Sequence, residues 1–161
     1  MKKILLSVSL ASLFVALAGS AAAVEQRPFL TLDVAKKMAA ACEAKAKQEG
    51  WKMNISIVDS GGNLKYFLRQ DDSFLKSIEI AHLKAGTSAG LPFSTKQVGE
   101  IAATRVPGIA YVPGIATFEG GLPIMTGDGK HIGAIGVSGA SAEQDGMCAQ
   151  AAVDAVKNDL K

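Results

Sequence analysis

The segment 119–145 constrains the fold of this chain more than any other. It contains two candidate strands, Leu122–Thr126 and His131–Ser138, joined by a Gly-Asp-Gly turn. The second strand carries Gly133 and Gly136, where strands ordinarily carry bulky side chains. Glycine inside a strand often marks a bulge or the close approach of another backbone or a ligand. The sequence therefore predicts that something packs flat against this strand, and both glycines are candidate ligand contacts.

The segment Met1–Ala23 has the pattern of an export signal. Two lysines precede the apolar run Ile4–Ala18, which is shorter than a typical membrane span, and three alanines then offer a cleavage site. We expect cleavage after Ala23 and a periplasmic or secreted location. The remaining segment, 24–161, has a length that suits one domain. The alternative is an uncleaved anchor helix.

Charge argues against two classes of partner. Loss of Lys2 and Lys3 with the signal would reduce the 17 basic residues to 15, against 15 acidic residues. Binding to nucleic acid or to an anionic membrane needs a basic surface. We therefore expect neither partner once the signal is removed.

Two cysteines, Cys42 and Cys148, lie on the apolar sides of the first and last predicted helices. Export permits a disulfide between them if the two helices touch. The alternative is two buried thiols that act as small apolar side chains.

The hydrophobic pattern predicts an α+β domain with an antiparallel sheet of about five strands. Helical spacing predicts helices over about 32–49, 74–89 and 142–158, with a short helix after Ser94. Alternation and turn residues predict strands over 53–57, 64–68, 115–118, 122–126 and 131–138. The strands group as hairpins, which favours an antiparallel sheet.

Several catalytic motifs fail at specific positions. The turn before His131 lacks the third glycine of a dinucleotide fingerprint, because Ile132 stands there, and His131 interrupts a P-loop. Ala140 replaces the last glycine of a nucleophile elbow. Glu79 and His82 form a single E-x-x-H, whereas a di-iron carboxylate site needs two. An enzyme is therefore the less favoured interpretation.

The remaining polar residues suggest a ligand site on the second helix. His82 stands near Leu75 and Ile78 and could ligate a haem iron, or it is a partly exposed helix histidine. Arg69 and Lys84 could hold a carboxylate such as a haem propionate, or they form ordinary ion pairs. The candidate binding residues are His82, Lys84, Arg69, His131, Gly133 and Gly136, with His82 as the metal ligand.

Four stretches together resemble the GlcG/HbpS family, a module also found at the C-terminus of PduO-type cobalamin adenosyltransferases. They are Ile55–Asn63, Arg69 with Asp71 and Asp72, Ser77–Ala89, and Glu119–Gly139 with Asp145. The resemblance implies a profilin-like α+β domain, homo-oligomers and, in some members, binding of haem or a related tetrapyrrole.

The leading hypothesis is an exported, non-catalytic haem-binding protein that scavenges or senses haem, with a sensor kinase as a candidate partner. One alternative is an enzyme or auxiliary protein for a small carboxylate metabolite, in which Arg69 or Lys84 contacts the anion. A second alternative is a structural homo-oligomer whose glycine-bearing strand serves close packing.

Overall fold

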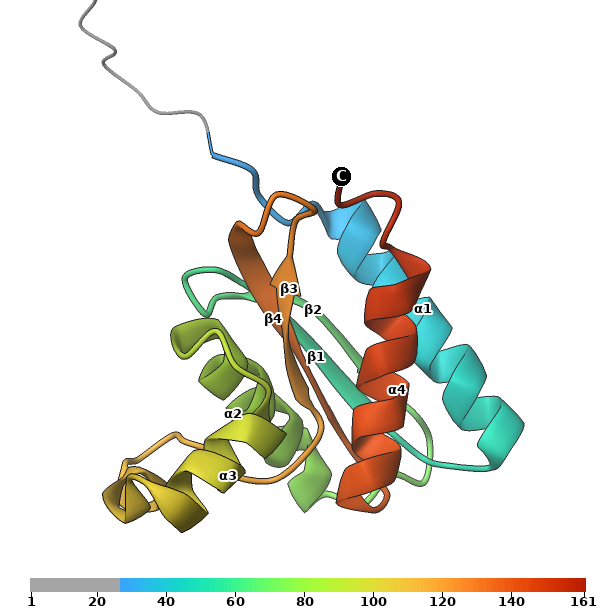
Figure 1. Cartoon of the computed structure of the whole chain (residues 1–161). Coiled ribbons are helices and arrows are strands. Elements are labelled where there is room, and N and C mark those ends of the chain that lie inside the picture. Colours follow the sequence, from blue (N-terminus) through green and yellow to red (C-terminus); the bar gives the residue numbers. More distant parts are fainter. Residues whose placement is uncertain (1–26) are drawn as a thin grey trace, which may run out of the picture.

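The structure is a computed structural model and describes residues 27–161, so the predicted export signal lies outside the described residues. An antiparallel sheet lies between two layers of helices (Figure 1). In chain order the elements are α1 (Leu32–Glu49), β1 (Asn54–Asp59), β2 (Leu64–Arg69), α2 (Lys76–Gly90), α3 (Thr95–Thr104), the 3-10 helix η1 (Pro107–Tyr111), β3 (Gly121–Met125), β4 (His131–Ser138) and α4 (Ala142–Ala155). Within this range no helix is long and apolar enough to span a bilayer.

The strand order is β2-β1-β4-β3, with every neighbouring pair antiparallel. β1 and β4 form the central pair, although β2, the helices α2 and α3, η1 and β3 all lie between them in the chain. Turn residues 59–63 join the β1–β2 hairpin, where the Asp59 carboxylate accepts hydrogen bonds from the Gly61 and Asn63 N–H groups. The sheet is therefore two hairpins joined at their inner strands.

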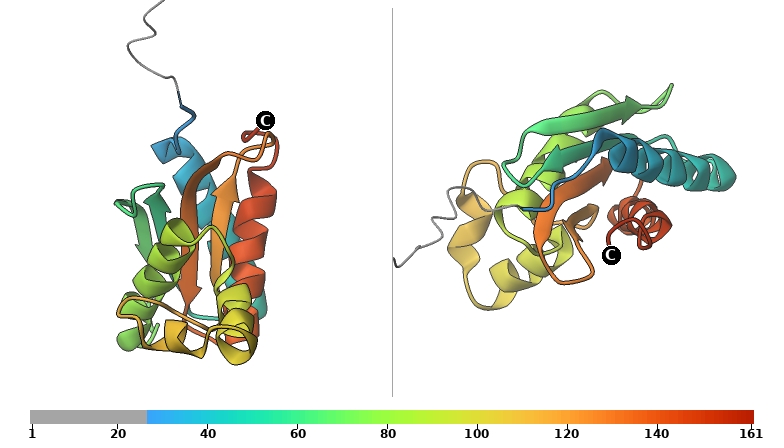
Figure 2. Two further views of the ribbon diagram at one scale, coloured as in Figure 1. Left: turned by 60° about the vertical axis from the view of Figure 1, so that its left-hand side comes forward. Right: turned by 90° about the horizontal axis from the view of Figure 1, so that it is seen from above.

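The two faces of the sheet differ in side-chain size, and this difference places the helices. Ile55, Ile57, Ile135 and Val137 face α1 and α4 and build the main core. The opposite face of β4 carries only small residues, including Gly136, and α2 packs directly against it. Figure 2 shows α1 and α4 on one side of the sheet and α2 with α3 on the other.

The helix ends follow the sequence signals closely. Thr31 caps α1, and Ser94 and Ser141 each form a capping box with the glutamine three residues later. α2 begins without a side-chain cap, and the Ser73 hydroxyl donates to the Gln70 carbonyl. α2 therefore depends on packing more than on a cap.

Of the two possibilities that the sequence left open for Cys42 and Cys148, the structure shows the disulfide, which joins α1 to α4. Both residues are fully buried in the main core. The bridge links the two helices that cover one face of the sheet, so it holds this layer together across a sequence separation of 106 residues.

The expected strand at 115–118 is absent, and the sheet has four strands where we predicted about five. The Ala116 N–H donates to the Thr87 hydroxyl on α2, at 2.8 Å, and pairs with no strand. Apolar residues near 115 therefore reflect packing against α2 and α3, which an alternation pattern cannot distinguish from a strand.

Candidate functional site

His82 is held in one orientation by the sheet beneath α2. Its Nδ1 lies 2.8 Å from the hydroxyl of Ser56 on β1, which is fully buried. Its ring stacks on Phe67 of β2, with the ring centroids 4.8 Å apart. A hydrogen bond at one imidazole nitrogen fixes the ring and leaves the other, Nε2, to bind a ligand.

A cavity of about 770 Å³ lies against α2 beside this histidine. Its lining residues are Leu75, Lys76, Ile78, Glu79, His82 and Leu83. All six belong to α2 or to its N-cap residue, Leu75, so the cavity is an open depression on the molecular surface. Leu75 is 75% exposed, so the depression has an accessible apolar side chain in its lining. Its volume falls within the range of small-molecule sites, about 300–1,000 Å³.

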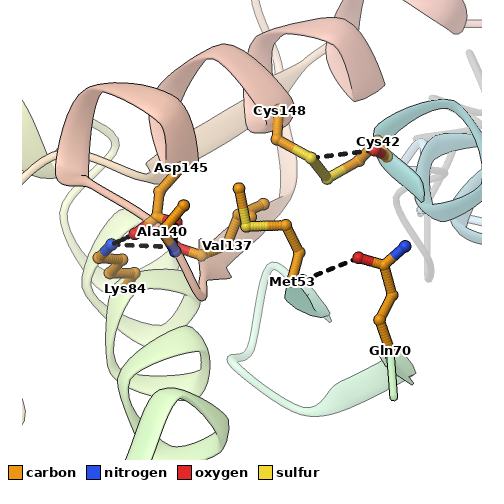
Figure 3. The surroundings of a disulfide bond; sticks show 8 residues. All are labelled: Cys42, Met53, Gln70, Lys84, Val137, Ala140, Asp145 and Cys148. Atoms are coloured by element: carbon orange, nitrogen blue, oxygen red, sulfur yellow. Dashed lines mark hydrogen bonds and ion pairs between the residues drawn. A yellow bond between two sulfur atoms is a disulfide. The ribbon is translucent and has the colours of Figure 1, made fainter. Parts of the chain in front are cut away.

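Lys84 points into the protein interior, away from this cavity. Its ammonium is 2.7 Å from the carboxylate of Asp145 on α4 and donates to the Val137 carbonyl of β4 at 3.0 Å (Figure 3). Both charged side chains are at most 3% exposed. Burial lowers the pKa of Lys84 and raises the pKa of Asp145, because each loses hydration as an ion. Lys84 thus binds a carboxylate of its own chain.

The glycines after Glu119 are explained by close contacts with Lys84. A side chain at Gly120 would lie 2.6 Å from the Lys84 ammonium, and one at Gly121 would lie 2.6 Å from the Lys84 carbonyl oxygen. Gly120 also has a φ of 126°, which only glycine adopts readily. Gly120 is therefore needed where the chain crosses the ion pair, and Gly121 where it crosses the backbone of α2.

The glycines of β4 make close packing contacts. A Cβ at Gly136 would be 2.1 Å from the Ala81 carbonyl oxygen of α2, and one at Gly133 would be 2.3 Å from the Val58 carbonyl oxygen of β1. The element that packs flat against Gly136 is thus α2 itself. The structure accounts for both glycines without a ligand.

Arg69 and His131 lie apart from the α2 cavity. Arg69 ends β2 and lines a separate cavity near the C-terminal end of α1. His131 begins β4, pairs with Met125 of β3, and has a buried Nε2 with no hydrogen-bond partner among the described residues. Of the six predicted residues, only His82 lines the α2 cavity.

Sequence reasoning did not find Ser56 and Phe67. The alternation over 53–57 is typical of a half-buried strand, yet both Asn54 and Ser56 are fully buried because α2 covers that face. The available signal was polar residues alternating with isoleucine on a strand, which is equally typical of a solvated face. Only the three-dimensional structure, with the Ser56–His82 contact, distinguishes a buried polar face from a solvated one.

The fold defines the class of the protein, a single α+β domain whose antiparallel sheet carries helices on both faces. The chain belongs to the family described as "haem degrading protein HbpS-like", whose profile matches residues 30–154. This confirms the resemblance drawn from the sequence motifs.

Relatives and solved structures extend this match over most of the chain. A 15.0 kDa protein of Citrobacter freundii, encoded in the dhaT–dhaS intergenic region, is 39% identical, and the match covers 81% of this chain and 94% of that protein. A crystal structure of an HbpS double mutant from Streptomyces reticuli has a TM-score of 0.77 at 28% identity, covering 92% and 97% of the two chains. A crystal structure of a PduOC–haem complex has a TM-score of 0.73 at 29% identity, covering 80% and 95%.

Proposed function

We propose that this protein binds haem on the outer face of α2, with His82 Nε2 as an axial ligand of the iron. The observation that carries the proposal is the Ser56–His82 hydrogen bond at the edge of an apolar cavity. It fixes the imidazole before any ligand arrives, so little side-chain entropy is lost on binding. The family match and the related PduOC–haem complex support the same ligand.

The residues around the cavity fit a haem. Leu75, Ile78 and Leu83 offer an apolar surface for a flat macrocycle. The porphyrin supplies four nitrogen ligands to its iron, so a single histidine is enough to attach it. Lys76 also lines the cavity, where it pairs with Glu79, and its ammonium would be a partner for a propionate.

The protein acts by holding haem, in scavenging or in sensing, outside the cytoplasm. The predicted export signal and the Cys42–Cys148 disulfide support this location, because disulfides persist mainly in oxidising compartments. A sensor kinase would read the haem-loaded state by contacting the α2 face.

Self-association is part of this proposal. Tyr111 of η1 is 86% exposed and the flanking Val106 and Val112 are 51% and 50% exposed, and exposed apolar groups of this kind favour contact with another protein surface. Sedimentation velocity of the haem-free protein tests this, with a single monomeric species as the contrary result.

A haem titration tests the proposed ligand. Wild-type protein should give a shifted Soret band that saturates at a simple ratio of haem to chain. His82→Ala should change the spectrum and weaken binding, because it removes the iron ligand. His131→Ala is the matched control, since it removes the other histidine of the chain and should leave the spectrum unchanged. A non-saturating titration, or identical spectra for wild type and His82→Ala, would sink the assignment.

A further inference from the structure

A second cavity, of about 330 Å³, lies where α1 ends and β2 ends, away from His82. Trp51 forms part of its wall, and Lys52, Arg69, Gln70 and Asp71 also line it. Its volume is near the lower end of the range of small-molecule sites, about 300–1,000 Å³. At roughly 30 Å³ per water molecule it holds the equivalent of about ten waters. This size suits a molecule of a few carbon atoms.

Gln70 is fixed so that it offers a donor to this cavity. The residue is 9% exposed, and its side-chain oxygen accepts a hydrogen bond from the Met53 N–H at 2.8 Å. Figure 3 shows the amide nitrogen of Gln70 directed away from Met53. Because the oxygen is engaged, the NH₂ group is the part of the amide that remains to meet a ligand. Gln70 therefore presents a pre-oriented donor.

Arg69 supplies the charge. Among residues 27–161 its guanidinium forms no ion pair, whereas Lys47 at the same cavity pairs with Glu43 at 2.8 Å. The Lys47–Glu43 pair carries no net charge. The other charged groups of the cavity are the cations Lys52 and Arg69 and the carboxylate of Asp71. The unpaired groups thus carry one net positive charge.

Two of the last carbonyl groups of α1 are already bound within the chain, which limits how far they offset this charge. The Ala46 carbonyl accepts from the Trp51 N–H at 2.9 Å, and the Lys47 carbonyl accepts from the Gly50 N–H. Satisfied carbonyls leave less of the negative end of the helix dipole facing the cavity.

We infer that this cavity binds a small monocarboxylate, with the ligand's carboxylate held by Arg69 and Gln70 and its carbon atoms against Trp51. Arginine suits this role because its planar fork donates two parallel hydrogen bonds to a carboxylate. One net positive charge matches one carboxylate better than two. The site is independent of haem, because none of its lining residues lines the α2 cavity.

Trp51 is the sole tryptophan of the chain, so its fluorescence reports directly on this cavity. The haem-free protein is titrated with sodium acetate and sodium lactate, and with sodium chloride at the same ionic strength. The carboxylates should give a saturable change and chloride should not. Arg69→Gln should weaken carboxylate binding about tenfold or more, since it removes a charge-assisted hydrogen-bond donor. Gln70→Glu should weaken carboxylate binding more than Arg69→Gln does, and its side chain still accepts from the Met53 N–H.

Arg105→Gln, at the exposed C-cap of α3, is the matched control and should bind like wild type. Far-UV circular dichroism checks that each variant is folded. The inference is overturned if neither carboxylate gives a saturable change, if Arg69→Gln and wild type bind equally, or if inorganic phosphate or succinate binds more tightly than both monocarboxylates.

Discussion

Substitution of Gly136 by alanine should separate α2 from the sheet and displace His82 in the proposed haem site. The added Cβ would lie 2.1 Å from the Ala81 carbonyl oxygen and 2.3 Å from the Ala85 nitrogen, both backbone atoms of α2. Ordinary contact begins at 3.4 Å, so relief by movement of α2 alone requires a displacement of more than an ångström. Backbone atoms cannot rotate away as a side chain would, so the helix must move as a unit.

Two costs follow from that displacement. Overpacking of a buried site costs about 1–3 kcal/mol. A shift of the same size along the hydrogen bond would carry the Ser56–His82 distance from 2.8 Å beyond hydrogen-bonding range. The buried Ser56 hydroxyl would then lose its partner, at about 1–3 kcal/mol. We expect Gly136→Ala to lower the free energy of unfolding by about 3 kcal/mol and to weaken haem binding as well.

Urea unfolding followed by far-UV circular dichroism measures the first effect, with free energies from linear extrapolation. Gly86→Ala is the control, because it adds the same methyl group to α2 at a position with no atom within 4 Å. It should stabilise the protein by about 0.5–1 kcal/mol, since alanine suits a helix better than glycine. A Gly136→Ala protein within about 0.5 kcal/mol of wild type would refute the packing explanation of this glycine.

Three further expectations concern the site and the core. Ser56→Ala should broaden or shift the Soret band of the haem complex, because the His82 ring loses its anchor, and Ser56→Thr should restore it. Lys84→Met alone should cost about 3–5 kcal/mol, since it leaves Asp145 buried without a partner, whereas Lys84→Met with Asp145→Leu should be much closer to wild type. Burial raises the pKa of Asp145, so wild type should lose stability as pH rises from the ordinary carboxyl pKa of 3.8 through the folded pKa of Asp145. Burial lowers the pKa of Lys84, so wild type should regain stability as pH rises from the folded pKa of Lys84 to 10.5. The double variant should lack both changes in a denaturation series over pH, and parallel curves would contradict this. Replacing Cys42 and Cys148 by alanine should lower the free energy of unfolding by about 2–5 kcal/mol, and an unchanged urea midpoint would count against the disulfide as a stabilising link.

Local signals in the sequence predicted most of the fold. The caps at Thr31, Ser94 and Ser141, the helical spacing and the turn residues act within a few positions of the chain, so they can be recognised without knowing the fold. The strand expected near residue 115 was wrong because its backbone is bound by the Thr87 side chain, a contact that alternation does not encode. The family resemblance supplied the architecture.

The candidate site was less accessible to sequence reasoning, because it depends on which residues meet across the fold. Lys84 suggested a ligand contact, but its partner Asp145 is 61 residues away and no local pattern links them. Likewise, Gly136 suggested a ligand, and the neighbour that fills the space is a helix of the same chain. His82 was identified from its aliphatic neighbours, whereas the Ser56 hydroxyl that orients it lies 26 residues upstream.

The strand order has a consequence for the way this chain folds. The second strand that pairs with β1 is β4, near the end of the chain. The centre of the sheet therefore cannot form until two segments far apart in the sequence have met. Until then the β1–β2 hairpin stands alone, and an isolated two-stranded hairpin is at best marginally stable in water. Contacts between distant parts of a chain slow folding. The sheet should therefore form slowly and in one cooperative step. Until β4 pairs with β1, the free edge of β1 is open to pairing with other chains.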